Sequence, residues 1–232
     1  MSGTPKTLTV TECHQLLAEL GPKENSSRGF TKSIRNYTMA LLMLDAGLRV
    51  GEVVALKLSD LYFGHEPVEN LTIAAEIAKN KSERTVPLAS RLRMALTELY
   101  KKTQASTCGP STTYAFRIWP NNRPLTTRQV ERIIRKAAIR SIGRPIHPHM
   151  LRHTFATRLM RKTNARIVME LLGHSQMSST QIYMNPNSDD LRKAIDQVND
   201  ELLDETTDKV HASLSHSPAD RRDAARADHD HR

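Results

Sequence analysis

The chain has 232 residues, of which 38% are hydrophobic and 25% charged, a composition typical of a soluble globular protein with room for one well-buried domain. No stretch approaches the ~18 consecutive apolar residues of a membrane span. Residues 1–6 lack the apolar core of a signal peptide, so we expect no export. The two cysteines, Cys13 and Cys108, have no metal-type spacing, which favours a reducing cytosol and argues against structural zinc.

The net charge of +9 is unevenly distributed along the chain. Residues 205–232 hold six acidic and five basic residues, so the other 204 residues carry 29 basic against 19 acidic side chains. A body this basic favours a polyanionic partner, because each phosphate that it neutralises releases counterions. Charge alone does not separate nucleic-acid binders from other basic proteins.

In chain order, hydrophobic spacing and capping signals predict a mostly helical first half. The predicted elements are a helix over residues 9–20 opened by a capping box, a polar loop over 23–31, a helix over 34–44 that ends before Gly47, a short helix over 50–58 and a loop over 64–70.

The second half opens with the one clear hairpin and continues as helices. The predicted elements are strands over 71–77 and 84–88, a helix over 90–102, an irregular stretch over 103–113, a basic helix from the Thr126 cap through 140, a helix with Pro148 in its first turn, a helix over 165–172 between Asn164 and Gly173, and a final helix over 188–203. Residues 205–232 have too few apolar side chains to offset their ordering entropy, so we expect a disordered tail. It holds four of the ten histidines, for which a metal site is the alternative to solvation.

Six side chains could carry chemistry, although each has an ordinary structural explanation when taken alone. An arginine at a helix start is commonly an ion-pair partner, a lysine in a hairpin turn is commonly solvated, and a tyrosine between apolar neighbours is commonly packed. The six are Arg49, Lys79, His149, Arg152, His174 and Tyr183.

Their order and spacing resemble the tyrosine recombinase (phage integrase) family, and in particular the catalytic domains of Xer and integrase proteins. The segment GLRVGEV at 47–53 resembles the family's first arginine box, and HPHMLRHTFAT at 147–157 resembles its His-x-x-Arg box. The segment LLGHS at 171–175, followed by Tyr183 nine residues after His174, resembles the second histidine and the nucleophile.

A fourth segment resembles the hairpin that carries the family's lysine. Lys79 precedes ERTVPL at 83–88, and alignment through that segment selects Lys79. Lys81, two residues further on in the same turn, remains the alternative.

The resemblance implies a mainly α fold with a small antiparallel β-hairpin or sheet. It also implies a site-specific DNA recombinase or integrase that cleaves and rejoins DNA through a 3′-phosphotyrosyl intermediate, with no ATP, cofactor or metal. Two permanently charged guanidiniums suit the two non-bridging oxygens of a phosphodiester, and a poor leaving oxygen needs a general acid. The implied roles are Tyr183 as nucleophile, Lys79 as general acid, Arg49 and Arg152 as phosphate ligands, His149 and His174 as hydrogen-bond donors or proton carriers, and Glu52 as a supporting residue that orients a cation.

The resemblance covers residues 8–203, so we expect a catalytic domain over 1–204 and the tail over 205–232. The domain would comprise an N-terminal helix over 9–20, a motif-bearing core over 35–185 and a C-terminal helix over 188–203. We expect no N-terminal core-binding domain, either because the enzyme is naturally minimal or because the chain is a fragment.

The implied partners are double-stranded DNA and further copies of the chain, two to four on DNA, without a membrane and in the cytoplasm at the nucleoid. The C-terminal helix has an apolar stripe at Leu191, Ile195 and Val198. This stripe suits docking on a neighbouring subunit, or packing on its own domain.

Two rival functions fit parts of the pattern. A type IB topoisomerase or telomere resolvase would use the same chemistry without exchanging a specific pair of sites. A non-catalytic DNA-binding protein could retain the fold, but it would not need all six residues.

Overall fold

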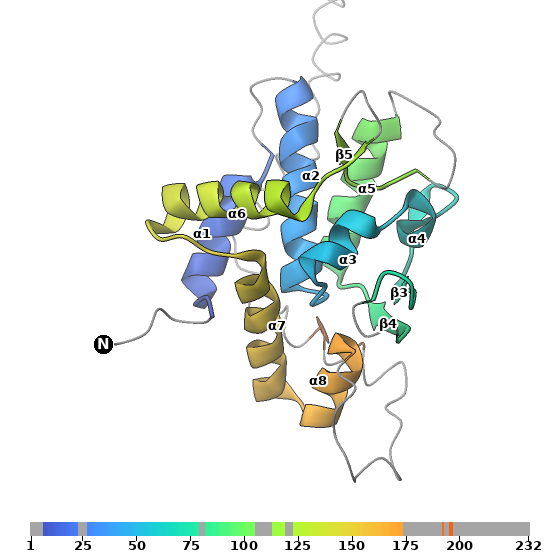
Figure 1. The fold of residues 1–232 in the computed structure, drawn as a ribbon, viewed down its shortest axis with the longest axis vertical. Helices are drawn as coiled ribbons and strands as arrows, with labels where there is room; N and C mark the ends of the chain where they lie inside the picture. Colours follow the sequence, from blue (N-terminus) through green and yellow to red (C-terminus); the bar gives the residue numbers. More distant parts are fainter. Residues whose placement is uncertain are drawn as a thin grey trace, which may run out of the picture.

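The computed structural model of the chain describes residues 7–22, 27–78, 82–104, 113–118, 123–173, 192 and 195–196. This part contains the helices α1 to α8 and three two-stranded antiparallel sheets, which confirms the predicted class of a mainly α protein with small β-hairpins (Figure 1). Within the described residues, no helix has the length and apolar character needed to cross a membrane.

Helix α2 (Ser27–Leu44) forms the centre of the fold and packs against α1 (Val10–Leu20) and α5 (Ser90–Gln104) (Figure 1). The residues from Met39 to Leu44 are all fully buried, which is the pattern of a helix enclosed on every side. The predicted loop over 23–31 is wrong in its second half, because α2 already begins at Ser27. Phe30 explains the difference, since its ring packs against the core beneath the Lys102 ammonium.

The predicted helix over 50–58 is instead two helices, α3 (Val50–Ala55) and α4 (Leu58–Leu61). Leu56 and Lys57 between them have extended backbone, and Lys57 pairs with Tyr114 in an isolated β-bridge. The Asp60 carboxylate then accepts the Lys57 backbone N–H at 2.8 Å, which starts the second helix. A contact with a distant segment therefore interrupts a helix that the local sequence favours.

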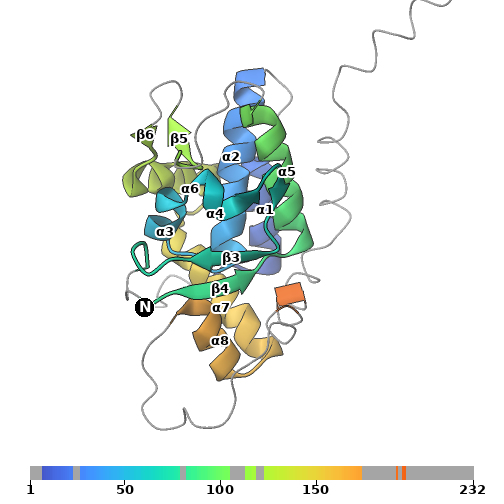
Figure 2. The same cartoon turned by 90° about the vertical axis from the view of Figure 1, so that its right-hand side faces the viewer.

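The three hairpins are β1 (Tyr62–Phe63) with β2 (Glu66–Pro67), β3 (Asn70–Ile73) with β4 (Arg84–Pro87), and β5 (Arg117–Ile118) with β6 (Arg123–Pro124). Strand β1 precedes the predicted loop over 64–70, and β2 lies within it, so part of that loop is wrong. The predicted β3–β4 hairpin is confirmed, but β3 ends at Ile73 because the N–H groups of Ile77 and Ala78 turn back to the Ala74 carbonyl. Ile73 pairs with Arg84 in the register, and Figure 2 shows this hairpin between the central helices and α8.

The remaining helices are α6 (Thr127–Ile142), α7 (Pro148–Lys162) and α8 (Ala165–Leu172). Their predicted end signals are confirmed. Thr126 and Gln129 form a capping box on α6, Pro148 opens α7, and the Asn164 side chain accepts the Ile167 N–H at 3.0 Å to cap α8. Three predicted segments lie wholly or mostly outside the described residues: the irregular stretch over 103–113, the final helix over 188–203 and the tail over 205–232.

Ile195 is helical and 1% exposed, and it belongs to the same core cluster as the central helices. Arg192 lies 3.6 Å from Glu69. In the single chain, Ile195 therefore packs on its own domain, the second of the two alternatives for this segment. Leu191 and Val198 lie outside the described residues.

Candidate active site

Arg49 is placed by a sharp turn between α2 and α3. Gly47 has a φ of +65°, a left-handed conformation that favours glycine, and the following Leu48 N–H returns to the Leu42 carbonyl. Arg49 then caps α3, with its side chain 21% exposed. One turn later, the Glu52 carboxylate accepts the Arg49 backbone N–H at 2.7 Å and the Arg49 Nη1 at 2.9 Å.

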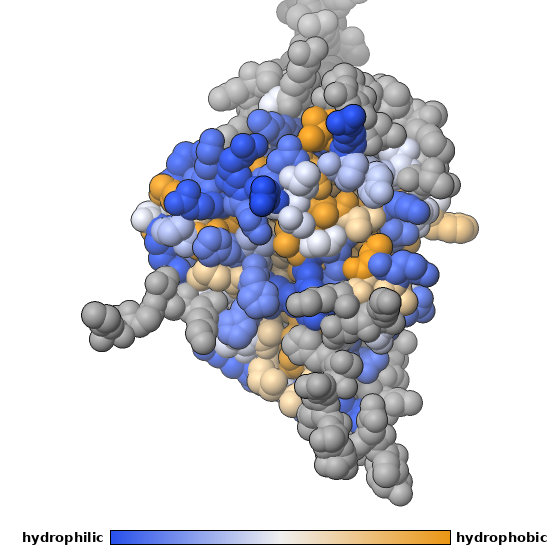
Figure 3. All heavy atoms as spheres, in the orientation of Figure 1, coloured by the Kyte–Doolittle hydropathy of each residue, from blue (hydrophilic) through white to orange (hydrophobic). Residues whose placement is uncertain are grey.

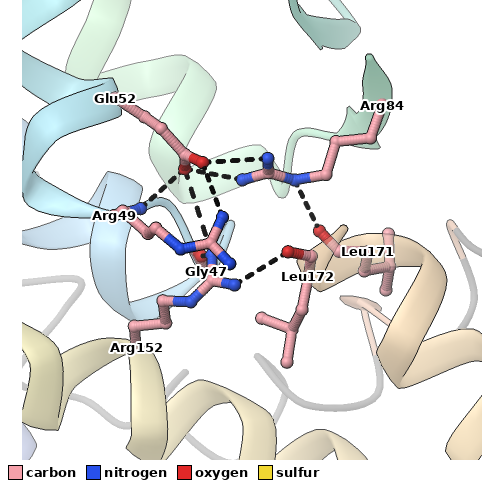
Figure 4. Close-up of polar contacts among 7 residues, drawn as sticks. All are labelled: Gly47, Arg49, Glu52, Arg84, Arg152, Leu171 and Leu172. Atoms are coloured by element: carbon pink, nitrogen blue, oxygen red, sulfur yellow. Dashed lines mark hydrogen bonds and ion pairs between the residues drawn. The ribbon is translucent and has the colours of Figure 1, made fainter. Parts of the chain in front are cut away.

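Arg152 lies in the first half of α7 and is buried. Its Nη1 donates to the Gly47 carbonyl, and its Nη2 donates to the Leu172 carbonyl at 2.7 Å (Figure 4). Its Nη1 also lies 3.9 Å from a Glu52 carboxylate oxygen. Backbone from the Arg49 turn and from the end of α8 therefore fixes the guanidinium.

Arg84 is a site residue that sequence reasoning missed. Its Nη1 and Nη2 donate to the two Glu52 oxygens at 3.0 and 2.6 Å, and its Nε donates to the Leu171 carbonyl at 3.0 Å (Figure 4). The signal was strand alternation: on β4, Arg84 and Val86 both point into the core. An arginine at an inward strand position indicates a buried partner.

The surroundings of these groups change their pKa values. Burial raises the pKa of Glu52, but hydrogen bonds from Arg84 and Arg49 outweigh burial and hold it below its ordinary value. Burial lowers the pKa of Arg152 to about 9, with the charge of Arg49 adding to this effect, Glu52 opposing it and Arg84 adding again. Three guanidiniums thus surround one carboxylate, which leaves an excess positive charge suited to an anion.

Arg49, Arg152 and His149 line one surface pocket. His149 is exposed on the first turn of α7, and Ile77 from the β3–β4 turn lines the same pocket. The structure therefore brings together Arg49, Glu52, His149 and Arg152 from the predicted set. Lys79 with its alternative Lys81, His174 and Tyr183 lie outside the described residues. In the part of the chain that is described, no group of three or more His, Cys, Asp or Glu residues could hold a metal ion.

One face of α6 is strongly basic. Figure 3 shows hydrophilic side chains covering this helix. The exposed charged residues on it are Arg128, Glu131, Arg132, Arg135, Lys136 and Arg140. Five cations and one anion on an exposed helix form a surface that suits a phosphate backbone.

Comparisons with known proteins give one consistent assignment. The sequence pattern described as "Phage integrase family" matches residues 6–189. A tyrosine recombinase of Pseudothermotoga lettingae is 39% identical over 66% of this chain and 50% of its own length, and tyrosine recombinase XerA of Pyrococcus furiosus is 32% identical over 84% of this chain and 62% of its own length. The chain thus spans between half and two thirds of these relatives.

Solved structures agree on the fold. The crystal structure of XerA recombinase matches with a TM-score of 0.60 and 26% identity, covering 85% of this chain and 66% of the other. XerH recombinase bound to its difH substrate matches with a TM-score of 0.53 and 23% identity, over 83% of this chain and 50% of the other. This chain therefore belongs to the phage integrase family, and its fold is that of the tyrosine recombinase catalytic domain.

Proposed function

We propose that the chain is a site-specific DNA recombinase that cleaves and rejoins double-stranded DNA through a 3′-phosphotyrosyl bond to Tyr183. The observation that carries the proposal is the pocket shared by Arg49, Arg152 and His149, in which backbone carbonyls and one carboxylate fix the two guanidiniums. The family named above supports the assignment of the reaction.

In this proposal, the pocket holds the scissile phosphate. Arg49 and Arg152 donate to its non-bridging oxygens, where negative charge grows as the attacking oxygen approaches. Each guanidinium is fixed before DNA arrives, so little reorganisation is needed in the transition state. His149, at the start of α7, adds a donor from the same side.

The reaction itself is a balanced exchange of phosphate esters. The Tyr183 phenol loses its proton to a site histidine, His149 or His174, and its oxygen bonds to phosphorus. The bond from phosphorus to the 5′-oxygen breaks, and that oxygen takes a proton from Lys79. Because the new bond is again a phosphate ester, reversal with a different 5′-hydroxyl rejoins the strand without ATP.

The proposed partners are double-stranded DNA and further copies of the chain. The basic face of α6 supports DNA as the ligand, because its cations can contact consecutive phosphates. Each copy supplies one tyrosine, so two copies can break both strands of one duplex and four copies can break the four strands exchanged between two duplexes. We therefore propose two to four copies on DNA. The proposed location is the cytoplasm, at the nucleoid.

We also propose the domain organisation expected above, with a catalytic domain over 1–204 and a disordered tail over 205–232. The rival functions are less well supported. The relatives described above carry the name tyrosine recombinase, which favours strand exchange over relaxation of supercoils. A protein that only bound DNA would not need to retain all six residues, Arg49, Lys79, His149, Arg152, His174 and Tyr183.

The test is covalent capture of DNA. The purified chain is incubated with sheared, labelled genomic DNA of the organism that encodes it and quenched in dodecyl sulfate, and protein-linked DNA is precipitated with potassium. Wild type should retain label, and Tyr183→Phe should retain none. Tyr114→Phe, which changes an exposed tyrosine outside the pocket, is the matched control and should behave as wild type.

Equal retention by Tyr183→Phe and wild type would refute the nucleophile, and no retention by wild type would refute the cleavage reaction. Sequencing the captured DNA separates the remaining rivals. A recombinase should yield one recurrent site, whereas a topoisomerase should yield dispersed sequences.

A further inference from the structure

We propose that Arg84 is a positioning residue for DNA cleavage, which holds Glu52 and the end of α8 so that Arg49 and Arg152 keep their N–H donors for the phosphate. This inference rests on the proposed function. It extends that function to a strand residue that does not line the phosphate pocket.

The first support is the geometry of the Glu52 carboxylate. Both Arg84 Nη atoms bind it, one to each oxygen, and both side chains are almost fully buried. A paired, planar contact of this kind fixes the carboxylate in plane and in rotation. The same carboxylate then orients Arg49 through its backbone N–H and its Nη1.

The second support is that several cationic donors compete for the single Glu52 carboxylate. A carboxylate offers about four lone-pair positions, and Arg84 occupies two of them. Without Arg84, the buried carboxylate would keep only its two bonds from Arg49, so it would attract the Arg152 Nη1, now 3.9 Å away, or take up a proton. The first outcome removes a donor from the phosphate, and the second weakens the hold on Arg49.

The third support is the contact with α8. Arg84 and Arg152 donate to the consecutive carbonyls of Leu171 and Leu172, which lie at a helix end where intrahelical partners are lacking. Gly173 permits this approach, because a Cβ there would lie 2.9 Å from the Arg84 Cδ. Arg84 therefore links the hairpin, the Arg49 turn and the end of α8.

Counting charges gives a distinctive prediction. The cluster of Arg49, Arg84, Arg152 and Glu52 carries a net charge of about +2 when every group is ionised. Arg84→Met reduces this to about +1, and adding Glu52→Gln returns it to about +2. The double variant should therefore bind an anion more tightly than the single Arg84 variant. If the loss in Arg84→Met came from damaged packing instead, the second substitution would weaken binding further.

The first measurement is the affinity for inorganic sulfate by calorimetry, which requires no cleavage. Arg84→Met should bind sulfate about tenfold more weakly than wild type, because one unit charge is removed beside the pocket. Arg84→Met/Glu52→Gln should recover most of that loss. Arg93→Met, which changes a partly exposed arginine paired with Glu69, is the control and should bind sulfate as wild type does.

The second measurement is single-turnover cleavage of the captured DNA site. Arg84→Met should slow cleavage by roughly 10- to 100-fold, the range expected for a partner that orients a reacting group. A substrate with a methylphosphonate at the scissile position lacks one negative oxygen, so the penalty on it should shrink severalfold. A defect in folding alone would slow both substrates equally.

Circular dichroism checks the folding of each variant, and Arg84→Gln replaces Arg84→Met if the latter unfolds. The proposal is overturned if the neutral Arg84 variant binds sulfate as wild type does, or if the double variant binds it more weakly than the single. An equal penalty on both DNA substrates would also overturn it. If wild type cleaves no DNA, the proposed function fails, while the sulfate measurement still decides whether Arg84 maintains anion binding by Arg49 and Arg152.

Discussion

Gly47 is the position where one added methyl group should disturb the site most. An ideal Cβ at Gly47 would lie 2.5 and 2.6 Å from two ring carbons of Phe155 and 3.0 Å from Leu172 Cδ2. Phe155 is fully buried, so the ring has little room to withdraw. The Gly47 carbonyl also accepts the Arg152 Nη1, and a shift of this turn would therefore move a proposed phosphate ligand.

The expected cost of Gly47→Ala has two parts. A left-handed conformation costs an alanine about 1–2 kcal/mol, and the φ of Gly47 is +65°. Forcing a methyl group into a filled core adds about 1–3 kcal/mol. The free energy of unfolding should therefore fall by about 2–5 kcal/mol, a large share of the stability of an ordinary domain.

Substitutions at two other glycines separate the conformational cost from the packing cost. Gly143 also has a positive φ, of +78°, but no atom lies within 4 Å of its ideal Cβ, so Gly143→Ala should show the conformational cost alone. Gly51 lies within α3, has no positive φ and also has no atom within 4 Å of its ideal Cβ. Gly51→Ala should therefore raise the free energy of unfolding by about 0.5–1 kcal/mol. Urea unfolding followed by circular dichroism measures all three. If Gly47→Ala and Gly143→Ala lose the same free energy, the close contact with Phe155 is refuted.

Three further predictions concern buried charges and the lysine. Asp45→Asn should lower the free energy of unfolding by about 3–5 kcal/mol, measured in urea, because it leaves the buried Arg91 without the Asp45 charge. The double variant Asp45→Leu/Arg91→Met should recover most of that loss. If the losses of the two single substitutions simply added up in the double variant, the result would contradict this. The pKa of Glu52 is lower in the folded protein than its ordinary value of 4.5. Ionised Glu52 therefore contributes its full stabilisation of the fold above pH 4.5, and this contribution is lost as the pH falls through the lower pKa of the folded state. The gap in unfolding free energy between wild type and Glu52→Gln should therefore shrink only in acid, and a gap that widened in acid would be incompatible with the shift. Lys79→Ala should cleave normal DNA slowly, because the departing 5′-oxygen then lacks a proton donor. It should cleave DNA with sulfur at the bridging 5′ position at close to the wild-type rate, because a thiolate leaves without a proton. If the sulfur substrate restores cleavage by Lys81→Ala instead, Lys81 is the general acid.

Local signals in the sequence predicted the ends of several helices. The side chains of Thr9, Thr126 and Asn164 each cap a helix through an N–H group three residues ahead, so neighbouring residues contain the whole interaction. Gly173 likewise ends α8 with a φ of +62°. These contacts need no tertiary structure, which is why single-sequence reasoning locates them.

Features that depend on distant segments could not be predicted in this way. The break between α3 and α4 involves Lys57 and Tyr114, which come together only in the folded chain. Arg84 bonds to Glu52 and Leu171, which are 32 and 87 residues away in the sequence. Its sequence neighbours indicate a strand, and only the fold places a carboxylate beside it.

The contacts that hold Arg152 bear on its proposed role as a ligand of the DNA phosphate. Its guanidinium donates to the carbonyls of Gly47 and Leu172, which are neutral partners and so position the group without cancelling its charge. The Glu52 carboxylate lies 3.9 Å from the Arg152 Nη1 and is already bound by Arg84. Burial, together with the charge of Arg49, lowers the pKa of Arg152 to about 9, so the protein stabilises the charged form less than water does. In the proposed function, a phosphate in the pocket would place a negative charge beside Arg152. Part of the free energy of DNA binding would then come from stabilising a cation that burial disfavours, where the reaction needs it.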